Sequence, residues 1–257
     1  MQRRLHPGAG GGADSSAMKL SIHSTATAAN AAAADCLAEQ LMRPTTRTVM
    51  LAAGNTPLEL YRQIGRRALP LGRLQLFALD EYVGVPLEEP RNCANLLRRQ
   101  VGEAWGVPAE QFHRVSSLAA EAPGSIQAHE QLIARAGGLD VLILGLGQSG
   151  HLGFNEPGSA EDSAGRMLAL EPISIEANRQ WFGGAYSPAQ GVTVGLKTIL
   201  AARHILMLAF GSHKATAVAG MVQGPRGVAC PASLLQGHPG LGVFLDDAAA
   251  VALKATA

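Results

Sequence analysis

The sequence has few cysteines and no long hydrophobic run. Its three cysteines, Cys36, Cys93 and Cys230, lie far apart, are odd in number and lack the spacing of a metal site. This pattern favours inert thiols in a reduced, cytoplasmic protein. The longest apolar runs have about six to eight residues, fewer than a membrane-spanning helix requires. The sequence therefore argues against a disulfide framework and against a membrane span.

A surplus of charge of either sign is also missing. The 21 Lys and Arg residues balance 20 Asp and Glu residues, which leaves a formal net charge of +1. A chain without a basic surplus has no general attraction for nucleic acid or for an anionic membrane. An anionic ligand must then be held by a local site. No group of His, Cys and Asp residues has zinc spacing either, which argues against metal-dependent hydrolysis.

Residues 1–17 differ in composition from the rest of the chain. Arg3 and Arg4 give a weakly basic start, but no apolar segment of signal-peptide length follows them. We expect either a flexible tail or a mis-assigned start, with Met18 opening the folded part. No linker or internal repeat interrupts residues 18–257, which predicts a single domain.

From Met18 onward, short aliphatic runs alternate with segments of helical periodicity. The expected strands are Thr48–Gly54, Leu74–Asp80, Leu139–Gly147, Val192–Leu196, His204–Gly211 and Leu241–Asp246. The expected helices are Thr25–Met42, Pro57–Ala68, Cys93–Trp105, Ser125–Ala136 and His213–Val222. Strands that are apolar along their length are typical of sheets buried on both faces. The alternation predicts an α/β fold: a mostly parallel sheet with helices on both faces, in the three layers of a Rossmann-like domain.

The segment Gly145–Pro157, at the end of one expected strand, concentrates polar groups that can do chemistry. It contains His151, Asn155 and Glu156 within a glycine-rich stretch. Parallel sheets place their active sites at the carboxyl ends of strands, and a carboxylate that orients an imidazole is a recurring catalytic arrangement. The stretch lacks the register of a serine nucleophile elbow. We therefore expect acid–base chemistry in this loop.

A second strand end carries the adjacent carboxylates Asp80 and Glu81. Neighbouring negative charges repel each other, which can raise the pKa of one carboxyl group and suit it to act as a general base. The alternative is that one carboxylate caps a turn and the other is solvated.

Two helix starts are candidates for binding an anion. In the turn Gly54–Pro57, Thr56 is expected to cap a helix whose first backbone N–H groups and dipole attract negative charge. Lys214 falls in the first turn of a later helix, which is unfavourable for a cation unless an anion is bound nearby. An ordinary capped turn and an exposed lysine are the alternatives at these two places.

Taken together, these segments resemble the glucosamine-6-phosphate deaminase/6-phosphogluconolactonase superfamily. The similar segments, in the family's order, are Gly54–Pro57 (phosphate turn), Leu79–Gly84 (strand-end acid), Gly150–Pro157 (deaminase signature), Gly211–Lys214 (phosphate lysine) and Pro231–His238 (C-terminal segment). The resemblance spans roughly residues 48–247. The Asn-Glu-Pro ending of the third motif distinguishes the amino-sugar enzymes from the lactonases.

The resemblance implies a substrate and a mechanism. A hexosamine 6-phosphate would bind with its phosphate at Gly54, Asn55, Thr56 and Lys214. His151, oriented by Glu156, would assist ring opening, and Asp80 would move the C2 proton to C1. The resulting ketose imine would lose ammonia by hydrolysis. No metal or organic cofactor is implied, because the open-chain sugar supplies its own electron sink. Glu81, Ser149 and Asn155 would be neighbours of the site.

The chain departs from the glucosamine-6-phosphate deaminases at one mechanistic position. Ser149 stands where those enzymes carry an aspartate two residues before the histidine, and a serine supplies no negative charge to the imidazole. Leu144–Gly153 is more similar to the galactosamine-6-phosphate isomerase/deaminase branch. An arginine that contacts phosphate in the deaminases falls near Arg179, shifted by one position.

Three questions stay open at this level. The substrate is glucosamine or galactosamine 6-phosphate, which differ in one hydroxyl configuration. A lactonase-like hydrolase and a non-catalytic sugar-phosphate-binding protein are the alternative functions, the second prompted by Ser149. The expected partner is a small sugar phosphate, not nucleic acid or a membrane, and a homo-oligomer is compatible with the sequence.

Overall fold

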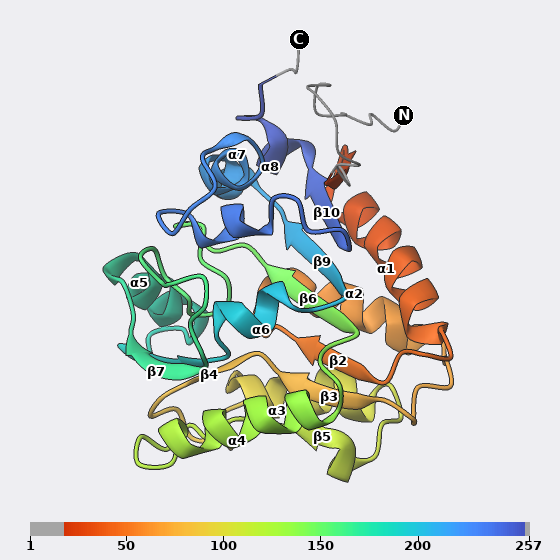
Figure 1. The fold of residues 1–257 in the computed structure, drawn as a ribbon, viewed down its shortest axis with the longest axis vertical. Coiled ribbons are helices and arrows are strands. Elements are labelled where there is room, and N and C mark those ends of the chain that lie inside the picture. The colour runs from red at the N-terminus through yellow and green to blue at the C-terminus, as the bar shows by residue number, and fades with distance from the viewer. Residues whose placement is uncertain (1–17, 255–257) are drawn as a thin grey trace.

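The computed structural model of the protein describes residues 18–254, and its centre is a seven-stranded parallel sheet (Figure 1). The strand order is β1-β10-β9-β6-β2-β3-β5, and each neighbouring pair runs parallel. The strands are β1 (Lys19–His23), β2 (Thr48–Leu51), β3 (Gln75–Ala78), β5 (Phe112–His113), β6 (Val141–Gly145), β9 (His204–Ala209) and β10 (Leu241–Asp246). This sheet confirms the predicted α/β class.

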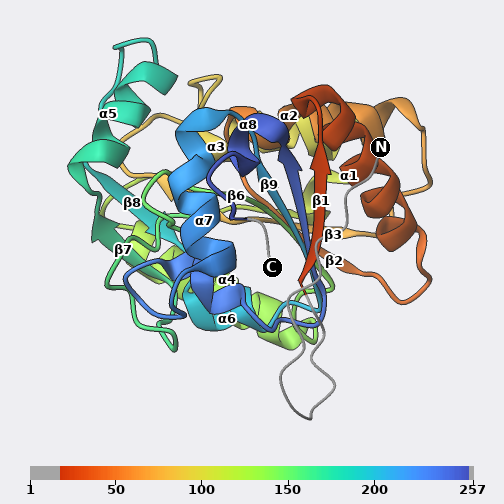
Figure 2. The same ribbon diagram turned by 90° about the horizontal axis from the view of Figure 1, so that it is seen from above.

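Helices cover both faces of this sheet, which gives three layers (Figure 2). One face packs against α1 (Ala26–Met42), α2 (Asn55–Arg66) and α3 (Cys93–Leu97). The other packs against α4 (Ala122–Arg135), α6 (Leu196–Leu200), α7 (Ala215–Gln223) and α8 (Asp247–Ala250).

The side chains of β6 illustrate why the strands are apolar along their length. Leu142 and Leu144 enter the core shared with α4 and α7, whereas Val141 and Ile143 enter the core shared with α1 and α2. All four are fully buried. Because successive strand residues point to opposite faces, a strand covered on both sides must be apolar at every position.

A second, three-stranded antiparallel sheet lies beside the main one. It contains β4 (Asp80–Tyr82), β8 (Gln190–Thr193) and β7 (Arg166–Ala169), in the order β4-β8-β7. The strand predicted over Val192–Leu196 is confirmed only at Val192 and Thr193, and its expected place in the parallel sheet is wrong. The strand ends at Thr193 and pairs antiparallel, and Leu196 begins α6. A short apolar run does not reveal the sheet to which it belongs.

Other predicted boundaries also shift. Gly54, not Thr56, precedes the first helical residue of α2. The helix expected over Cys93–Trp105 changes after Leu97 into a π-helical segment, Arg98–Glu103. The helix expected from His213 begins as a 3₁₀ turn, Ser212–Lys214, that leads into α7. β1, β5, β7 and α5 (Pro172–Trp181) had no counterpart in the prediction.

Two expectations concern the ends of the chain and membranes. The tail predicted over residues 1–17 lies outside the described residues. Among residues 18–254, no helix is long and apolar enough to cross a membrane.

The strand order creates a crevice at a defined place. From β2 the chain builds outward through β3 and β5, then returns to the other side of β2 with β6 and β9. Such a reversal opens a crevice outside the carboxyl ends of the two strands that flank it. The loop after β6 and the start of α2 meet there.

Candidate active site

The predicted residues of four strand ends come together in one cavity at this crevice. The cavity has two adjoining parts, of about 180 and 290 Å³. Asp80, which follows β3, lines only the smaller part, which we call the inner part, and the larger part is called the outer part. His151 after β6, Thr56 after β2 and Lys214 after β9 line both parts. Because these strands are neighbours in the order β9-β6-β2-β3, residues far apart in the sequence share one site.

The loop after β6 passes very close to other groups of the site. The ring of His151 lies against Gly147, where an added Cβ atom would be 2.2 Å from Nε2. At Gly153 the backbone has a φ of +57°, and an added Cβ would be 2.6 Å from Oγ1 of Thr193 and 3.3 Å from Oδ2 of Asp80. Glycine at these two positions is what allows the loop to pack around its own histidine and against Asp80.

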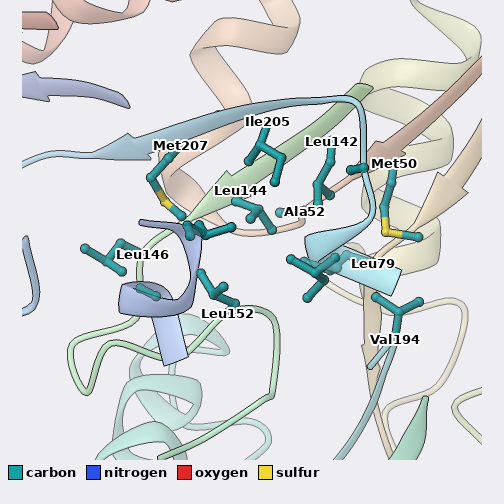
Figure 3. Close-up of a cluster of buried hydrophobic side chains, with 14 of the residues drawn as sticks. Met50, Ala52, Leu79, Leu142, Leu144, Leu146, Leu152, Val194, Ile205 and Met207 are labelled. Carbon is teal, nitrogen blue, oxygen red and sulfur yellow. The ribbon is translucent and has the colours of Figure 1, made fainter. Parts of the chain in front are cut away.

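Buried contacts fix the same loop to the fold. Leu146 and Leu152 belong to the apolar cluster that contains Leu144 (Figure 3). Asn155 is fully buried, donates to the carbonyl oxygens of Leu152 (3.0 Å) and Val194 (2.9 Å), and accepts from Arg166 (2.9 Å). The structure thus places Asn155 as an internal brace of the loop, away from the cavity lining.

The C-terminal segment supports the loop from its other side. The backbone N–H of Ala232, in the 3₁₀ turn Pro231–Leu235, donates to the carbonyl oxygen of Gly150 (2.9 Å). The thiol of Cys230 lies against Gly150, where an added Cβ would be 2.5 Å from Sγ. His238 bonds the carbonyl oxygen of Ala202 (2.8 Å), at some remove from the loop.

His151, Glu156 and Ser149 form a hydrogen-bonded triangle. Nδ1 of His151 is 3.0 Å from Oε2 of Glu156 and 2.9 Å from the Ser149 hydroxyl, which itself donates to Oε2 (3.1 Å). The carboxylate acceptor keeps the proton of a neutral imidazole on Nδ1. Nε2 is then the nitrogen available for proton exchange in the cavity.

Glu156 is held as a carboxylate by its donors. Burial disfavours its charge, but hydrogen bonds from His151, Ser174 and Ser149 outweigh this and lower its pKa below the ordinary value. Ser174, on α5, donates to the other carboxylate oxygen, Oε1. Ser149 therefore supports the imidazole indirectly: without a charge of its own, it helps to keep the charge of Glu156.

Asp80 is buried and has a raised pKa, two properties that suit a general base. Its side chain lines the inner cavity and the residue is 8% exposed. Burial, and then the neighbouring charge of Glu81, raise its pKa to about 8. The sequence-based interpretation gave charge repulsion as the cause, whereas desolvation is the larger effect. A raised pKa makes the ionised form a stronger proton acceptor.

Glu81 faces away from the cavity. Its carboxylate accepts hydrogen bonds from the backbone N–H groups of Tyr82, Cys93 and Ala94, the last two in the first turn of α3. Burial raises its pKa to about 7 against the opposing effect of these bonds. Of the two adjacent carboxylates, that of Glu81 caps the start of α3, and that of Asp80 lines the cavity.

The start of α2 offers unpaired donors to the cavity. Gly54 adopts a φ of +104°, a backbone conformation suited to glycine, and α2 has no side-chain cap. The first N–H groups of a helix have no partner within it and carry the positive end of the dipole. Gly54, Asn55 and Thr56 all line the cavity. This is the geometry of an anion site.

Lys214 adds a full positive charge beside that helix start. It is partly buried, which lowers its pKa, and it precedes the first residue of α7, where the dipole disfavours a cation. Among residues 18–254, no carboxylate lies within ion-pair distance of it. An anion bound between Lys214 and the start of α2 would satisfy both.

Arg179 is the predicted residue that the structure keeps apart from the others. It lies on α5, pairs with Glu176 (3.0 Å) and has a side chain that is 58% exposed. It does not line either part of the cavity.

Sequence reasoning missed several residues that line the outer part of the cavity. These are Gln148, Ile173, Ser174, Ala177, Asn178, Trp181 and His213. Most lie on α5, whose start carried one usable signal: Pro172 at the first helical position. Nothing in the sequence showed that this helix folds back over the cavity.

The cavity thus combines an imidazole, a buried carboxyl group of raised pKa and a cationic end. Among residues 18–254, no three His, Cys, Asp or Glu side chains are grouped to hold a metal ion. The arrangement can bind a small anionic molecule and transfer protons at two of its atoms.

Known proteins with similar sequences span nearly the whole chain. A family model described as glucosamine-6-phosphate isomerases/6-phosphogluconolactonase matches residues 21–243. The glucosamine-6-phosphate deaminase of Pseudarthrobacter chlorophenolicus is 40% identical over 226 residues, or 86% of this chain and 87% of the relative. That of Streptomyces avermitilis is 39% identical over 243 residues, or 92% and 93% of the two chains.

Solved structures are similar over the same extent. A monomeric glucosamine-6-phosphate deaminase matches with a TM-score of 0.87 and 28% identity, over 91% of this chain and all (100%) of that one. A 6-phosphogluconolactonase from Trypanosoma brucei shares the fold with a TM-score of 0.75 and 22% identity, over 92% and 99% of the two chains. These findings confirm the resemblance inferred from the motifs: the chain belongs to the glucosamine-6-phosphate isomerase/6-phosphogluconolactonase family.

Proposed function

We propose that this protein is an enzyme that converts a hexosamine 6-phosphate and water into a ketohexose 6-phosphate and ammonia. The observation that carries the proposal is the shared cavity, in which Asp80 and His151 lie beside the anion site of α2 and Lys214, with His151 hydrogen-bonded to Glu156 behind it. The names of the relatives, which are glucosamine-6-phosphate deaminases, support the reaction type. Because its proposed substrate is a phosphorylated sugar, we propose that the protein acts in the cytoplasm.

The first step opens the sugar ring. The phosphate binds the N–H groups at Asn55 and Thr56 and the ammonium group of Lys214, which fixes one end of the substrate. Nε2 of His151 takes the proton of the C1 hydroxyl and returns it to the ring oxygen, so that the C1–oxygen ring bond breaks and a free aldehyde forms. Glu156 stabilises the imidazolium that exists between the two transfers.

The second step moves a proton from C2 to C1. Asp80 removes the C2 proton, the electrons form the C1–C2 double bond of an enol, and one proton of the substrate's ammonium group passes to O1. The proton held by Asp80 is then delivered to C1, which leaves a hydroxymethyl group at C1. The product is a 2-imine, which water hydrolyses to the C2 ketone and ammonia. With a pKa raised to about 8, Asp80 is mostly protonated at neutral pH in the free protein. The positive amino group of the bound substrate favours its ionised form.

The substrate that we propose is glucosamine 6-phosphate, on the strength of the relatives' names. Galactosamine 6-phosphate is retained as the alternative because of Ser149. The two hexosamines differ only at C4, so one or two contacts in the cavity decide between them. A lactone-hydrolysing activity would use the same phosphate site.

The test is a set of parallel assays on the purified protein. Ammonia release is measured with glucosamine 6-phosphate, galactosamine 6-phosphate and unphosphorylated glucosamine, and hydrolysis is measured with 6-phosphogluconolactone. We expect ammonia from a hexosamine 6-phosphate, none from the unphosphorylated sugar, and no lactone turnover. Absence of ammonia from both hexosamine phosphates would overturn the proposal. Binding without turnover would point to a sugar-phosphate-binding protein.

A further inference from the structure

Glu156 has three hydrogen-bond partners, and one of them comes from a different part of the fold. Ser149 and His151 belong to the same loop as Glu156, and both contact Oε2. Ser174 lies on α5 and donates to Oε1. Ser174 and Glu156 are each 5% exposed, so the contact is nearly buried, at the margin of the outer part of the cavity.

The contact at Oε1 determines where Oε2 points. The terminal torsion of a glutamate is soft, and the carboxylate rotates readily when only one oxygen is held. With Oε1 fixed by Ser174, Oε2 stays directed at Nδ1 of His151, 3.0 Å away. Without Ser174, no partner among the described residues holds Oε1, and the carboxylate can turn away from the imidazole.

The helix that carries Ser174 also forms a wall of the cavity. Ile173, Ala177 and Trp181 of α5 line its outer part. The C-terminal end of α5 is tied to the small sheet through aromatic contacts: the rings of Tyr82 and Phe182 have centroids 5.2 Å apart in an edge-to-face arrangement. A shift of α5 would therefore change both the wall of the cavity and the hydrogen bond to the Glu156 carboxylate.

We infer that Ser174 is a positioning residue, which couples the placement of α5 over the cavity to the orientation of the Glu156–His151 pair. This inference rests on the proposed function. With α5 packed as in the structure, the carboxylate is locked and the imidazole is aligned for proton transfer. With α5 displaced, the serine hydroxyl leaves Oε1 and the pair loses its alignment. Ring opening then depends on the same helix that encloses the sugar.

The test compares Ser174→Ala with a matched substitution, Ser187→Ala. Ser187 is exposed, follows α5 and lines neither part of the cavity. Loss of a hydrogen bond to a charged group typically reduces a rate by about 10- to 100-fold. We expect a decrease of that size in kcat for Ser174→Ala. The inhibition constant of inorganic phosphate stays within about twofold, because other elements hold the phosphate. Ser174→Thr, which keeps the hydroxyl group, restores most of kcat, and Ser187→Ala behaves as the wild type.

Two further measurements keep the inference testable. The ¹⁵N chemical shift of Nδ1 in His151 reports its hydrogen bond without reference to activity, and we expect it to change in Ser174→Ala and not in Ser187→Ala. If the alanine variant does not fold, Ser174→Cys replaces it, because a thiol is a weak donor of similar size. Wild-type kcat together with an unchanged Nδ1 shift in the folded variant would overturn the inference. A wild-type protein that releases no ammonia would overturn the proposed function instead, and the Nδ1 shift would still decide the role of Ser174.

Discussion

The imidazole of His151 lies directly against the backbone of Gly147. A Cβ atom on Gly147 would be 2.2 Å from Nε2 and from Cδ2 of the ring, far inside contact distance. Gly147 does not have a positive φ, so its backbone angles are open to other residues. The absence of a side chain is therefore required for space alone, and this space is occupied by the imidazole ring of His151.

Replacing Gly147 by alanine should displace His151 and little else. We expect kcat to fall by about 100-fold or more, the contribution typical of a general acid–base group, while inorganic phosphate still protects the protein against thermal unfolding. Gly124→Ala on α4 is the matched control, because a Cβ there meets no atom within 4 Å. It should retain full activity and gain about 0.5–1 kcal/mol of stability. Full activity in Gly147→Ala would contradict the assigned position of the ring.

Substituting Asp80 by asparagine should remove turnover and stabilise the protein at high pH. The unfolded carboxyl group loses its proton near pH 4, whereas burial raises the folded pKa to about 8. Between these values the folded state holds a proton that the unfolded state has lost, so stability falls as pH rises. Asparagine avoids this cost. We expect Asp80→Asn to be more stable than the wild type on the order of 5 kcal/mol at pH 9, with the difference vanishing below about pH 4. Urea denaturation at several pH values measures it, and equal stability at pH 9 would contradict the raised pKa.

The same pKa predicts the acid limb of the activity profile. Only ionised Asp80 accepts the C2 proton, so kcat/KM should rise with pH up to about 8 as the free protein loses the proton. The limb of kcat should lie at lower pH, because the substrate's amino group favours the carboxylate in the complex. Initial rates across pH 5 to about 9 test both limbs. An acid limb of kcat/KM near the ordinary pKa of aspartate, about 4, would assign the base to another group.

We expect Lys214 to bind the phosphate group of the substrate and to contact no other part of it. We expect Lys214→Met to raise KM by about 10- to 100-fold, the effect of removing a charged hydrogen-bond donor. Inhibition by inorganic phosphate should weaken by the same factor. Lys197→Met is the control, because Lys197 is exposed and lies outside the cavity lining. If both variants had the same KM, the phosphate would have to be placed elsewhere.

We expect a substitution of Asn155 to lower the stability of the protein, although the residue is next to Glu156 in the sequence. Asn155→Asp keeps the shape but replaces two donated hydrogen bonds, to Leu152 and Val194, by contacts between a carboxylate and carbonyl oxygens. A buried unsatisfied group of this kind costs about 1–3 kcal/mol. We expect a decrease of at least that size in the free energy of unfolding at pH 7, measured by urea denaturation. Unchanged stability would mean that the loop is not braced at this point.

The sequence predicted the central strands well, for a physical reason. β2, β3, β6, β9 and β10 are buried on both faces, and their continuous aliphatic runs are the direct result. The edge strand β1, Lys19–His23, is only partly buried and mixes polar with apolar residues, so it gives no such signal. The small sheet escaped prediction because its strands mix polar with apolar residues, and its pairing is decided by contacts between distant segments.

The candidate site was predicted to the extent that it lies at strand ends. Asp80 ends a predicted strand, and His151 and Lys214 each follow one; parallel strands bring their carboxyl ends to one edge. The contribution of α5 was not predictable in this way, because no periodicity shows over which part of the sheet a helix will fold. For the same reason, the sequence indicated neither that Arg179 points away from the cavity nor that Ser174 points toward Glu156.

The hydrogen bond from Ala232 to Gly150 gives the last of the family-like motifs, Pro231–His238, a structural role. No residue of Pro231–His238 lines the cavity. The backbone of this turn nevertheless supports the loop that carries His151, through the hydrogen bond to Gly150. An insertion or deletion here would leave the sequence of the loop unchanged, yet we expect it to shift the position of His151 relative to the cavity. The spacing between Cys230 and Ala232 therefore sets the position of Gly150, and with it the geometry of the proposed reaction, from outside the cavity.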